Sequence, residues 1–274
     1  MALQISPEFW KFIPQLRFEP TPRRIRAQLG DNTVVDSNRA YLVYEPRRVT
    51  PIFAVPPQDI DAELTVPAAG PPAGDPLAAV PPGAPMDPRY PFAAHTTSGQ
   101  PLDLRAGAHE LPGAAFRPDD PDLAGHVLLD FPAFDRWLEE DQVIEGHPRD
   151  PFHRVDARAS SRAVRVHLGG QLLAETREPL FVYETMLPVR TYYPRDDVDW
   201  DALSSSLKHT VCPYKGTASY WSVTDQPQGA DLAWSYEKVL PDSAQLKDRV
   251  SFFDERTDVY IDDAKQEISS FFRF

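Results

Sequence analysis

Two stretches of the chain share one pattern of hydrophobic and polar positions. Residues 25–45 read IRAQLGDNTVVDSNRAYLVYE, and residues 164–184, at a constant offset of 139, read VRVHLGGQLLAETREPLFVYE. In each stretch the residues before the first glycine alternate between apolar and polar, which is typical of a strand with one buried face. Gly30 in one copy and Gly169 in the other supply the positive φ of a tight turn. Each stretch therefore predicts a β-hairpin.

This repeat predicts two related domains in tandem. The chain has 274 residues, about twice the ~100 to 150 residues of a usual domain. We expect an N-terminal packing segment at residues 1–21, a first and divergent copy at 22–144, a linker at 145–161, and a complete second copy at 162–274. The first copy carries a Pro-, Ala- and Gly-rich insertion at 66–88, which is expected to form an exposed loop.

Most of the remaining apolar runs are short and rich in β-branched and aromatic residues, which favours strands. The strands are expected at 180–182, 189–193, 219–223, 231–236, 250–253 and 258–261. Two short helices are also expected. One follows Asp199 and carries Trp200, Leu203 and Leu207, and the other opens at 130–132 and carries Phe134, Trp137 and Leu138. The predicted fold is mainly β, with two tandem antiparallel domains and few short helices.

Composition narrows the classes of function. The net charge of -13 disfavours binding to nucleic acid, because nonspecific affinity depends on Lys and Arg that neutralise phosphates. No apolar run approaches the ~20 residues of a membrane helix, and the first residues do not resemble a secretory signal. The single cysteine excludes an intrachain disulfide and paired zinc knuckles. These features predict a cytoplasmic protein without membrane or nucleic-acid partners.

The segment HTVCPYKGTASYWSV, residues 209–223, concentrates reactive side chains. Lys215 lies three residues after Cys212, and a neighbouring ammonium favours the reactive thiolate, so Cys212 is a candidate nucleophile with His209 as its base. The alternative is that Cys212 is a small buried hydrophobic residue in a proline-shaped turn. Lys215 is the second candidate catalytic residue.

Two further clusters combine charges with aromatic rings. In FVYETMLPVRTYYP, residues 181–194, Glu184 and Arg190 are predicted either to pair across a turn or to line a pocket in which Arg190 binds a carboxylate or phosphate. At the constant offset Arg190 falls on Pro51, so the first copy is expected to lack this role. Residues 232–241 and 251–262 supply aromatic side chains that either form core or wall a pocket with Tyr220 and Trp221.

Metal binding and the common catalytic motifs find little support. His147, Asp150, His153 and Asp156 recur every three residues, but the prolines at 148 and 151 interrupt any helix that would align them, so no metal site is expected. The sequence contains no P-loop, GxSxG, HExxH or GxGxxG spacing.

These motifs carry a resemblance to a known family. In the order VRVHLGGQLLAET, PLFVYETMLPVRTYYP, TVCPYKGTASYWSV, LAWSYEKVLP and FFDERTDVYID, residues 162–263 resemble the family named domain of unknown function 427, sometimes labelled nucleotidyltransferase-like. The first copy resembles it more weakly, with AAHTTSG at 93–99 where CPYKG would fall. The whole chain is similar to tandem-domain members known mainly from actinobacteria.

The resemblance implies a fold rather than an activity. It implies a small antiparallel β-domain of the β-tent kind, similar to methionine sulfoxide reductase B and the thalidomide-binding domain of cereblon. Those relatives hold zinc with four cysteines, and this chain has one, so a zinc site is not expected. The transferase label implies a carboxylate pair that holds metal and a phosphate-binding loop, which the sequence does not show.

The leading hypothesis is a binding module in the second domain for a small flat or anionic ligand, without cofactor or metal. The predicted binding residues are Tyr183, Glu184, Arg190, Tyr192, Lys215, Trp221, Trp234, Tyr236 and Arg256. An enzyme that uses Cys212 or Lys215 is the first alternative. A structural or partner-binding protein, recognised through the 66–88 insertion and the apolar N-terminal segment, is the second. The oligomeric state stays open.

Overall fold

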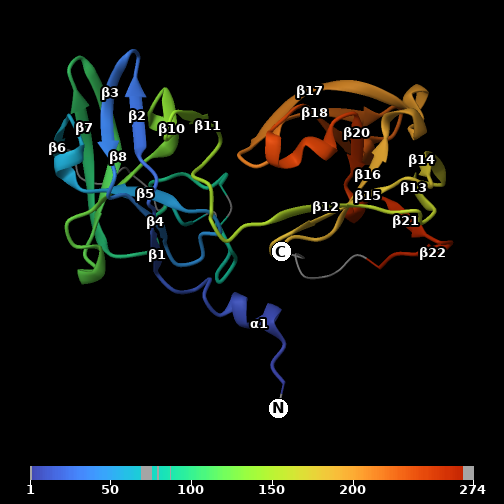
Figure 1. Cartoon of the computed structure of the whole chain (residues 1–274), viewed down its shortest axis with the longest axis horizontal. Coiled ribbons are helices and arrows are strands. Elements are labelled where there is room, and N and C mark those ends of the chain that lie inside the picture. The colour runs from blue at the N-terminus through green and yellow to red at the C-terminus, as the bar shows by residue number, and fades with distance from the viewer. Residues whose placement is uncertain (1, 69–75, 79, 87, 268–274) are drawn as a thin grey trace. The chain divides into compact units, whose positions relative to one another are not determined.

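The chain folds into two units built from antiparallel sheets (Figure 1). The computed structural model describes residues 2–68, 76–78, 80–86 and 88–267. The two compact units comprise Met1–Asp150 and Pro151–Phe274. Each unit contains a seven-stranded and a four-stranded sheet, so the predicted mainly β fold is confirmed.

In the first unit the long sheet has the order β1-β4-β5-β9-β8-β7-β6 and the short sheet has the order β11-β10-β2-β3. The helix is α1 (Ile5–Trp10). The strands are β1 (Arg17–Pro20), β2 (Ile25–Leu29), β3 (Asn32–Ser37), β4 (Tyr41–Tyr44), β5 (Ile52–Val55), β6 (Glu63–Thr65), β7 (Gly99–Ala106), β8 (His109–Pro118), β9 (Val127–Leu129), β10 (Arg136–Glu139) and β11 (Gln142–Ile144). Single 3₁₀ turns are η1 (Pro57–Asp59), η2 (Pro121–Leu123) and η3 (Phe131–Ala133).

In the second unit the orders are β12-β15-β16-β20-β19-β18-β17 and β14-β13-β21-β22. The strands are β12 (Val155–Ala159), β13 (Val164–Leu168), β14 (Gln171–Thr176), β15 (Leu180–Glu184), β16 (Arg190–Pro194), β17 (Leu203–Cys212), β18 (Gly216–Val223), β19 (Ala233–Val239), β20 (Arg249–Phe252), β21 (Asp258–Ile261) and β22 (Ala264–Lys265). The 3₁₀ turns are η4 (Arg195–Asp197), η5 (Trp200–Ala202), η6 (Pro227–Gly229), η7 (Pro241–Leu246) and η8 (Asp254–Arg256).

The two units have the same topology. Reading along each long sheet, β1 corresponds to β12, β4 to β15, β5 to β16, and the remaining strands follow in step. The predicted hairpins are β2–β3 and β13–β14, and both contain the same irregularity after their third residue pair. The duplication therefore extends over both sheets of each unit, well beyond the residues in which the sequence displays it.

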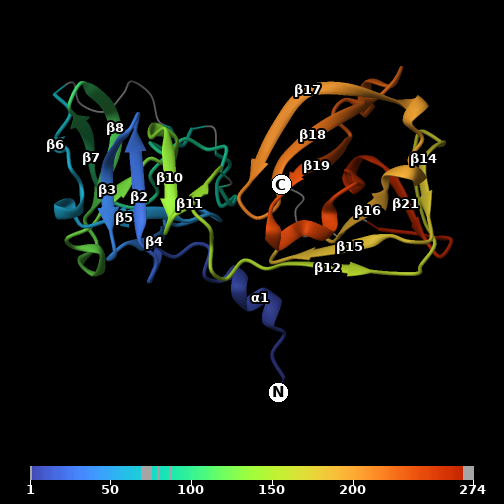
Figure 2. The same cartoon turned by 45° about the horizontal axis from the view of Figure 1, so that its top comes forward.

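Each long sheet has apolar side chains on both faces, which is typical of a sheet covered on both sides. In the second unit one face packs against the short sheet through a core that includes Val166, Tyr193 and Phe252. The other face, here called the inner face, carries a separate core with Tyr192, Trp234 and others. The sheet curls around this inner face, so that β12 and β15 lie across from β17 to β19 (Figures 1 and 2). The turn η7 lies inside the curl and contacts both β12 and β19.

The two predicted helices are wrong. Residues 200–202 form one 3₁₀ turn that leads directly into β17, and residues 131–133 form another that precedes β10 by two residues. The pattern of a capping residue followed by three apolar positions is also compatible with a single 3₁₀ turn that leads into a strand with one buried face. Among the described residues no helix has the length and apolar character needed to cross a bilayer.

The flanking segments are more ordered than the sequence indicates. Residues 1–21 include β1, the edge strand of the first long sheet, and residues 145–161 include β12, the edge strand of the second. The N-terminal segment buries Ile13 and packs Leu16 on the first unit, whereas Phe9 and Phe12 are half exposed.

The proline-rich insertion is not a wholly exposed loop. Val80 and Met86 are buried in a small cluster with Ala94, and the Val49 N–H donates to the Met86 carbonyl at 3.0 Å. The expectation of exposure is therefore wrong for these two residues. Positions 69–75, 79 and 87 of the insertion lie outside the described residues.

The turn between β17 and β18 depends on Gly216. Its φ is +110°, and a Cβ there would lie 2.1 Å from the Lys238 carbonyl oxygen. Gly216→Ala is expected to destabilise the protein by roughly 3 kcal/mol or more in urea unfolding, because both backbone strain and a clash oppose the methyl group. Gly170, with φ +86° and open space around it, is the control, and Gly170→Ala should cost only about 1 kcal/mol. Equal losses would contradict this account of the turn.

Candidate functional site

Glu184 closes the curled sheet of the second unit. It ends β15, and its side chain, only 4% exposed, lies on the inner face with that of Val182. The Lys215 Nζ donates to Glu184 Oε1 at 2.5 Å, and His153 Nε2 lies 3.4 Å from Oε2. Lys215 belongs to the β17–β18 turn, and β18 lies four places from β15 in the sheet order. The ion pair therefore joins two distant parts of one sheet.

Both partners of this pair are charged at neutral pH. Burial alone would raise the pKa of Glu184, but the His153 hydrogen bond and the Lys215 charge outweigh it and lower that pKa to about 2. Burial likewise opposes the Lys215 ammonium, but the Glu184 charge outweighs it and raises the pKa of Lys215. A protonated amine has no lone pair for attack, so this geometry gives no support to Lys215 as a nucleophile.

The first unit has a counterpart of this closure. Glu45, directly after β4, is fully buried and accepts hydrogen bonds from the backbone N–H groups of Thr96 and Thr97 at 3.1 and 3.4 Å. Arg48 Nε and His95 Nδ1 each lie 3.2 Å from its Oε2. Thr96 and Thr97 lie three and two residues before the start of β7, the counterpart of β18. A buried carboxylate thus closes both long sheets, with different donors in each.

An aromatic row lies behind the Glu184–Lys215 pair. Tyr192, Ser251 and Trp234 are direct cross-strand neighbours on β16, β20 and β19, so their side chains share the inner face. Trp234 Nε1 donates to the Tyr192 hydroxyl at 3.2 Å, and burial raises the pKa of Tyr192 to about 12. Lys215 Nζ lies 5.7 Å from the ring centre of Tyr236, which continues the row along β19.

Arg190 lies on the same face but does not pair with Glu184. Its guanidinium donates to both carboxylate oxygens of Glu255, at 2.8 and 2.5 Å, and lies 5.8 Å from the ring centres of Trp234 and Phe253. Asp254 is 3.9 Å away, and burial raises its pKa to about 7 although Arg190 opposes that rise. Of the two alternatives for Glu184 and Arg190, the direct ion pair is not formed, and each residue pairs with another partner.

The counterpart of Arg190 in the first unit is Ile52. Arg190 pairs with Val182, and Ile52 pairs with Val43. Ile52 follows Val43 by nine positions, whereas Arg190 follows Val182 by eight, so the first unit has one residue more in this loop. Pro51, the counterpart given by the constant offset, was therefore wrong by one position. The first copy has no arginine at the corrected position either.

Three of the predicted binding residues lie elsewhere. Tyr183 alternates with Val182 and Glu184, faces away from the inner face, and is 44% exposed. Trp221 lies on the opposite face of β18 from Tyr220 and packs edge-on against Trp200. Arg256 donates to the backbone carbonyls of residues 228 and 230 at 2.5 and 2.6 Å. Their local sequence did not reveal on which face each side chain lies.

Cys212 is a free, partly exposed thiol next to the inner-face core. Thr210, two residues earlier, faces inward and bonds to the Tyr220 hydroxyl at 2.9 Å. Because side chains alternate along β17, His209 faces outward, where its Nδ1 lies 3.4 Å from the Ser219 hydroxyl. The thiol–imidazole pair, one of the two alternatives for Cys212, is not assembled.

Two residues of the site escaped the sequence analysis. His153, weighed there as a metal ligand, contacts Glu184 and stacks on Tyr214 with ring centres 4.5 Å apart. Ser251 is fully buried between Tyr192 and Trp234, and its hydroxyl has no hydrogen-bond partner within the described part of the chain. A serine in an otherwise apolar, buried strand was the available signal for Ser251. No group of three or more metal-ligating side chains occurs among the described residues.

The Glu184–Lys215 pair can be tested with a double-mutant cycle in urea unfolding. Lys215→Met is expected to cost about 3 to 5 kcal/mol, because it leaves the Glu184 charge buried without its ammonium. The double variant Glu184→Gln with Lys215→Met should cost clearly less than the sum of the two single changes, because it removes both buried charges. Additive costs would show that the pair does not couple the two ends of the sheet.

The comparisons with known proteins agree with this architecture. A family model described as "Domain of unknown function (DUF427)" matches residues 17–71 and 156–263. The first segment begins at β1 and the second within β12, which are corresponding strands of the two units. No curated protein matches the chain. With more than half of its residues matched in two corresponding segments, the chain is a tandem member of the DUF427 family.

Proposed function

We propose that the second unit is a binding module that holds a small flat molecule against its inner aromatic face. Tyr192, Trp234 and Tyr236 offer ring faces and edges, and the hydroxyl of Ser251 offers a donor and an acceptor between two of those rings. Flat ligands gain from both stacking and a few directed hydrogen bonds in such a setting.

The unpartnered Ser251 hydroxyl is the observation that carries the proposal. A buried hydroxyl without a partner costs about 1 to 3 kcal/mol, and an alanine of similar size would avoid that cost. A ligand polar group that bonds to Ser251 would offset the penalty only in the bound state. This is the pattern expected of a binding residue rather than a packing residue.

The charges near the face favour a neutral ligand over an anion. Lys215 is paired with Glu184, and Arg190 is held by both oxygens of Glu255. Each cation is therefore compensated before any ligand arrives. An anion would have to displace a buried or half-buried carboxylate, and that exchange brings little net gain.

Binding requires the cover of the inner face to move. The aromatic side chains are buried, and η7 lies over them with Leu246 inside their core. One tether of η7 is the Ser243 hydroxyl, which donates to the Tyr214 carbonyl at 3.0 Å. We therefore expect η7 to act as a lid, because it is a short segment that packs against the aromatic side chains of the inner face.

The ligand class is testable by thermal unfolding of the full chain against adenosine, uracil, nicotinamide, glutarimide and benzoate. A flat neutral compound is expected to raise the Tm, since a ligand at 100 times its Kd adds roughly 2.7 kcal/mol. Trp234→Phe should give a smaller Tm shift, which corresponds to an apparent affinity at least tenfold weaker. Trp221→Phe, on the opposite face of the same sheet, is the matched control and should retain it. The absence of a shift with every compound, or equal loss in both variants, would reject the proposal.

The unpartnered hydroxyl of Ser251 leads to a second prediction, which can be tested without a ligand. Ser251→Ala is expected to raise the free energy of unfolding by about 1 kcal/mol, because it removes an unsatisfied buried group. Ser243→Ala removes a buried serine that does have a partner, and it should lower that energy by about 1 kcal/mol. Urea unfolding of both variants beside the wild type decides the matter. A loss of stability in both would mean that Ser251 has a structural partner.

A further inference from the structure

The first unit contains a pocket at the opposite end of its long sheet from Glu45. Its volume is ≈ 450 Å³. It is open to solvent, and four segments line it: the end of β1 with Thr21, the β3–β4 turn, the residues around the start of η1, and the two residues before β9. Loops that meet at one end of a rigid sheet are a common setting for binding sites.

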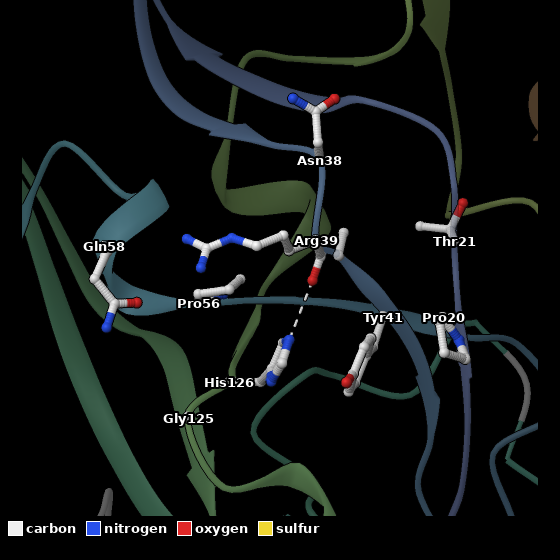
Figure 3. A pocket seen from close by; sticks show the side chains of 10 residues that line it. Pro20, Thr21, Asn38, Arg39, Tyr41, Pro56, Gln58, Gly125 and His126 are labelled. Carbon is white, nitrogen blue, oxygen red and sulfur yellow. Dashed lines mark hydrogen bonds between the residues drawn. The ribbon is translucent and has the colours of Figure 1, made fainter.

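Arg39 is held in place at this pocket. Its Nη2 donates to Asp59 Oδ1 at 2.5 Å, and the Ser37 hydroxyl donates to the other oxygen of that carboxylate at 2.7 Å. The Arg39 backbone N–H in turn donates to the Ser37 hydroxyl at 3.1 Å. The side chain is 62% exposed and extends from the turn toward Gln58, above His126 (Figure 3). Its remaining N–H groups are thus both oriented and accessible.

His126 forms one wall of the pocket. Its ring stacks on Tyr41 with ring centres 3.9 Å apart, and its Nε2 lies 3.1 Å from the Arg39 carbonyl oxygen (Figure 3). In the second unit Arg249, which begins β20, donates to the Glu178 carbonyl at 2.9 Å in the corresponding place. Because a carbonyl oxygen can only accept, the hydrogen bond to Arg39 places a hydrogen on Nε2 of His126. The ring is therefore fixed in both orientation and tautomer.

The polar groups that line the pocket are rich in donors. They comprise the guanidinium of Arg39, the amides of Asn38 and Gln58, and the hydroxyls of Thr21 and Tyr41, whereas the Nε2 hydrogen of His126 is already directed at the Arg39 carbonyl oxygen. No Asp or Glu stands among its ten described lining residues, although the chain carries 41 acidic residues and a net charge of -13. Asp59 binds Arg39 through one nitrogen only, whereas Glu255 binds Arg190 through two, and Arg39 is far more exposed. The remaining N–H groups of Arg39 can therefore reach an oxyanion without displacing Asp59, and the neutral donors around them suit such a group.

We propose that this pocket binds a small molecule through an oxyanion, a carboxylate or a phosphate, with Arg39 as the charged partner and Asn38 and Gln58 as neutral donors. The site is distinct from the inner face of the second unit and does not depend on the function proposed there. The second unit has Glu178 where the first has Arg39, so only the first unit has this charged group. The duplicated units are thereby assigned different ligands.

The test is a two-dimensional ¹⁵N–¹H NMR titration of the full chain with inorganic phosphate, acetate, malonate and benzoate, with glycerol as a neutral probe. Amide shifts at 38–41 and 125–126 are expected to move saturably with phosphate or with a carboxylate. The anion that shifts these amides identifies the oxyanion that the pocket binds. Binding of phosphate or of a carboxylate supports the proposal.

Two arginine variants give the controls. Arg39→Gln should weaken the anion at least tenfold. Arg105→Gln removes another exposed arginine of the first unit that pairs with a single carboxylate, Glu63, and should leave the affinity unchanged. The proposal is overturned if no anion moves these amides, if glycerol moves them equally, or if Arg39→Gln binds as the wild type does. Retained dispersion of the other amides in Arg39→Gln shows that the variant is folded.

Discussion

A buried carboxylate at the end of one strand is the interaction on which each long sheet depends. Burying a carboxylate costs several kcal/mol unless donors surround it, so the segments that carry those donors must come to it. In the second unit the donors are Lys215 and His153. In the first they include Arg48, His95 and two backbone N–H groups. Both solutions bring the segment before β7 or β18 back to the end of β4 or β15, and the sheet curls as a result.

This constraint explains why the motif Val-Tyr-Glu appears in both copies while its partners differ. The valine is inner core and the glutamate is the acceptor, but any sufficient set of donors completes the closure. The first unit recruits His95 from the segment between its insertion and β7, whereas the second uses the turn that contains Lys215. Once the sheet is closed, its inner face is free to vary. It is aromatic in the second unit, with Trp234 and Tyr192, and more aliphatic in the first, with Ile52 and Ala54.

Much of the fold could be predicted from the sequence because it rests on local patterns. The alternation before Gly30 and Gly169 located the hairpins, and the repeat located the two units. The predicted helices at Trp200 and Phe131 failed because a cap followed by apolar residues describes a single turn as well as a helix. The edge strands β1 and β12 were missed because neither contains a buried residue, so that strand pairing rather than a hydrophobic pattern defines them.

The candidate site could be predicted only in part, because it depends on contacts between distant residues. Of the nine predicted binding residues, five lie on strands with their side chains on the inner face, among them Glu184 and Tyr236, and a sixth, Lys215, reaches that face from the β17–β18 turn. Tyr183 and Trp221 do not, since neighbours along a strand point to opposite faces and the sequence does not say which face is inner. His153 and Ser251 were missed because one lies in an apparent linker and the other in an apolar run. The pocket at Arg39 was missed because four separate loops build it.

The pKa of Glu184 tests the closure most directly. A ¹³C NMR titration of its side-chain carboxyl group in the folded protein would measure it. The account predicts a midpoint of about 2, far below the ordinary 4.5, and therefore a contribution to stability that is complete above pH 4.5 and is lost as the pH falls toward 2. A midpoint near 4.5 would mean that Lys215 and His153 do not stabilise the carboxylate, and would contradict the closure of the sheet by this pair.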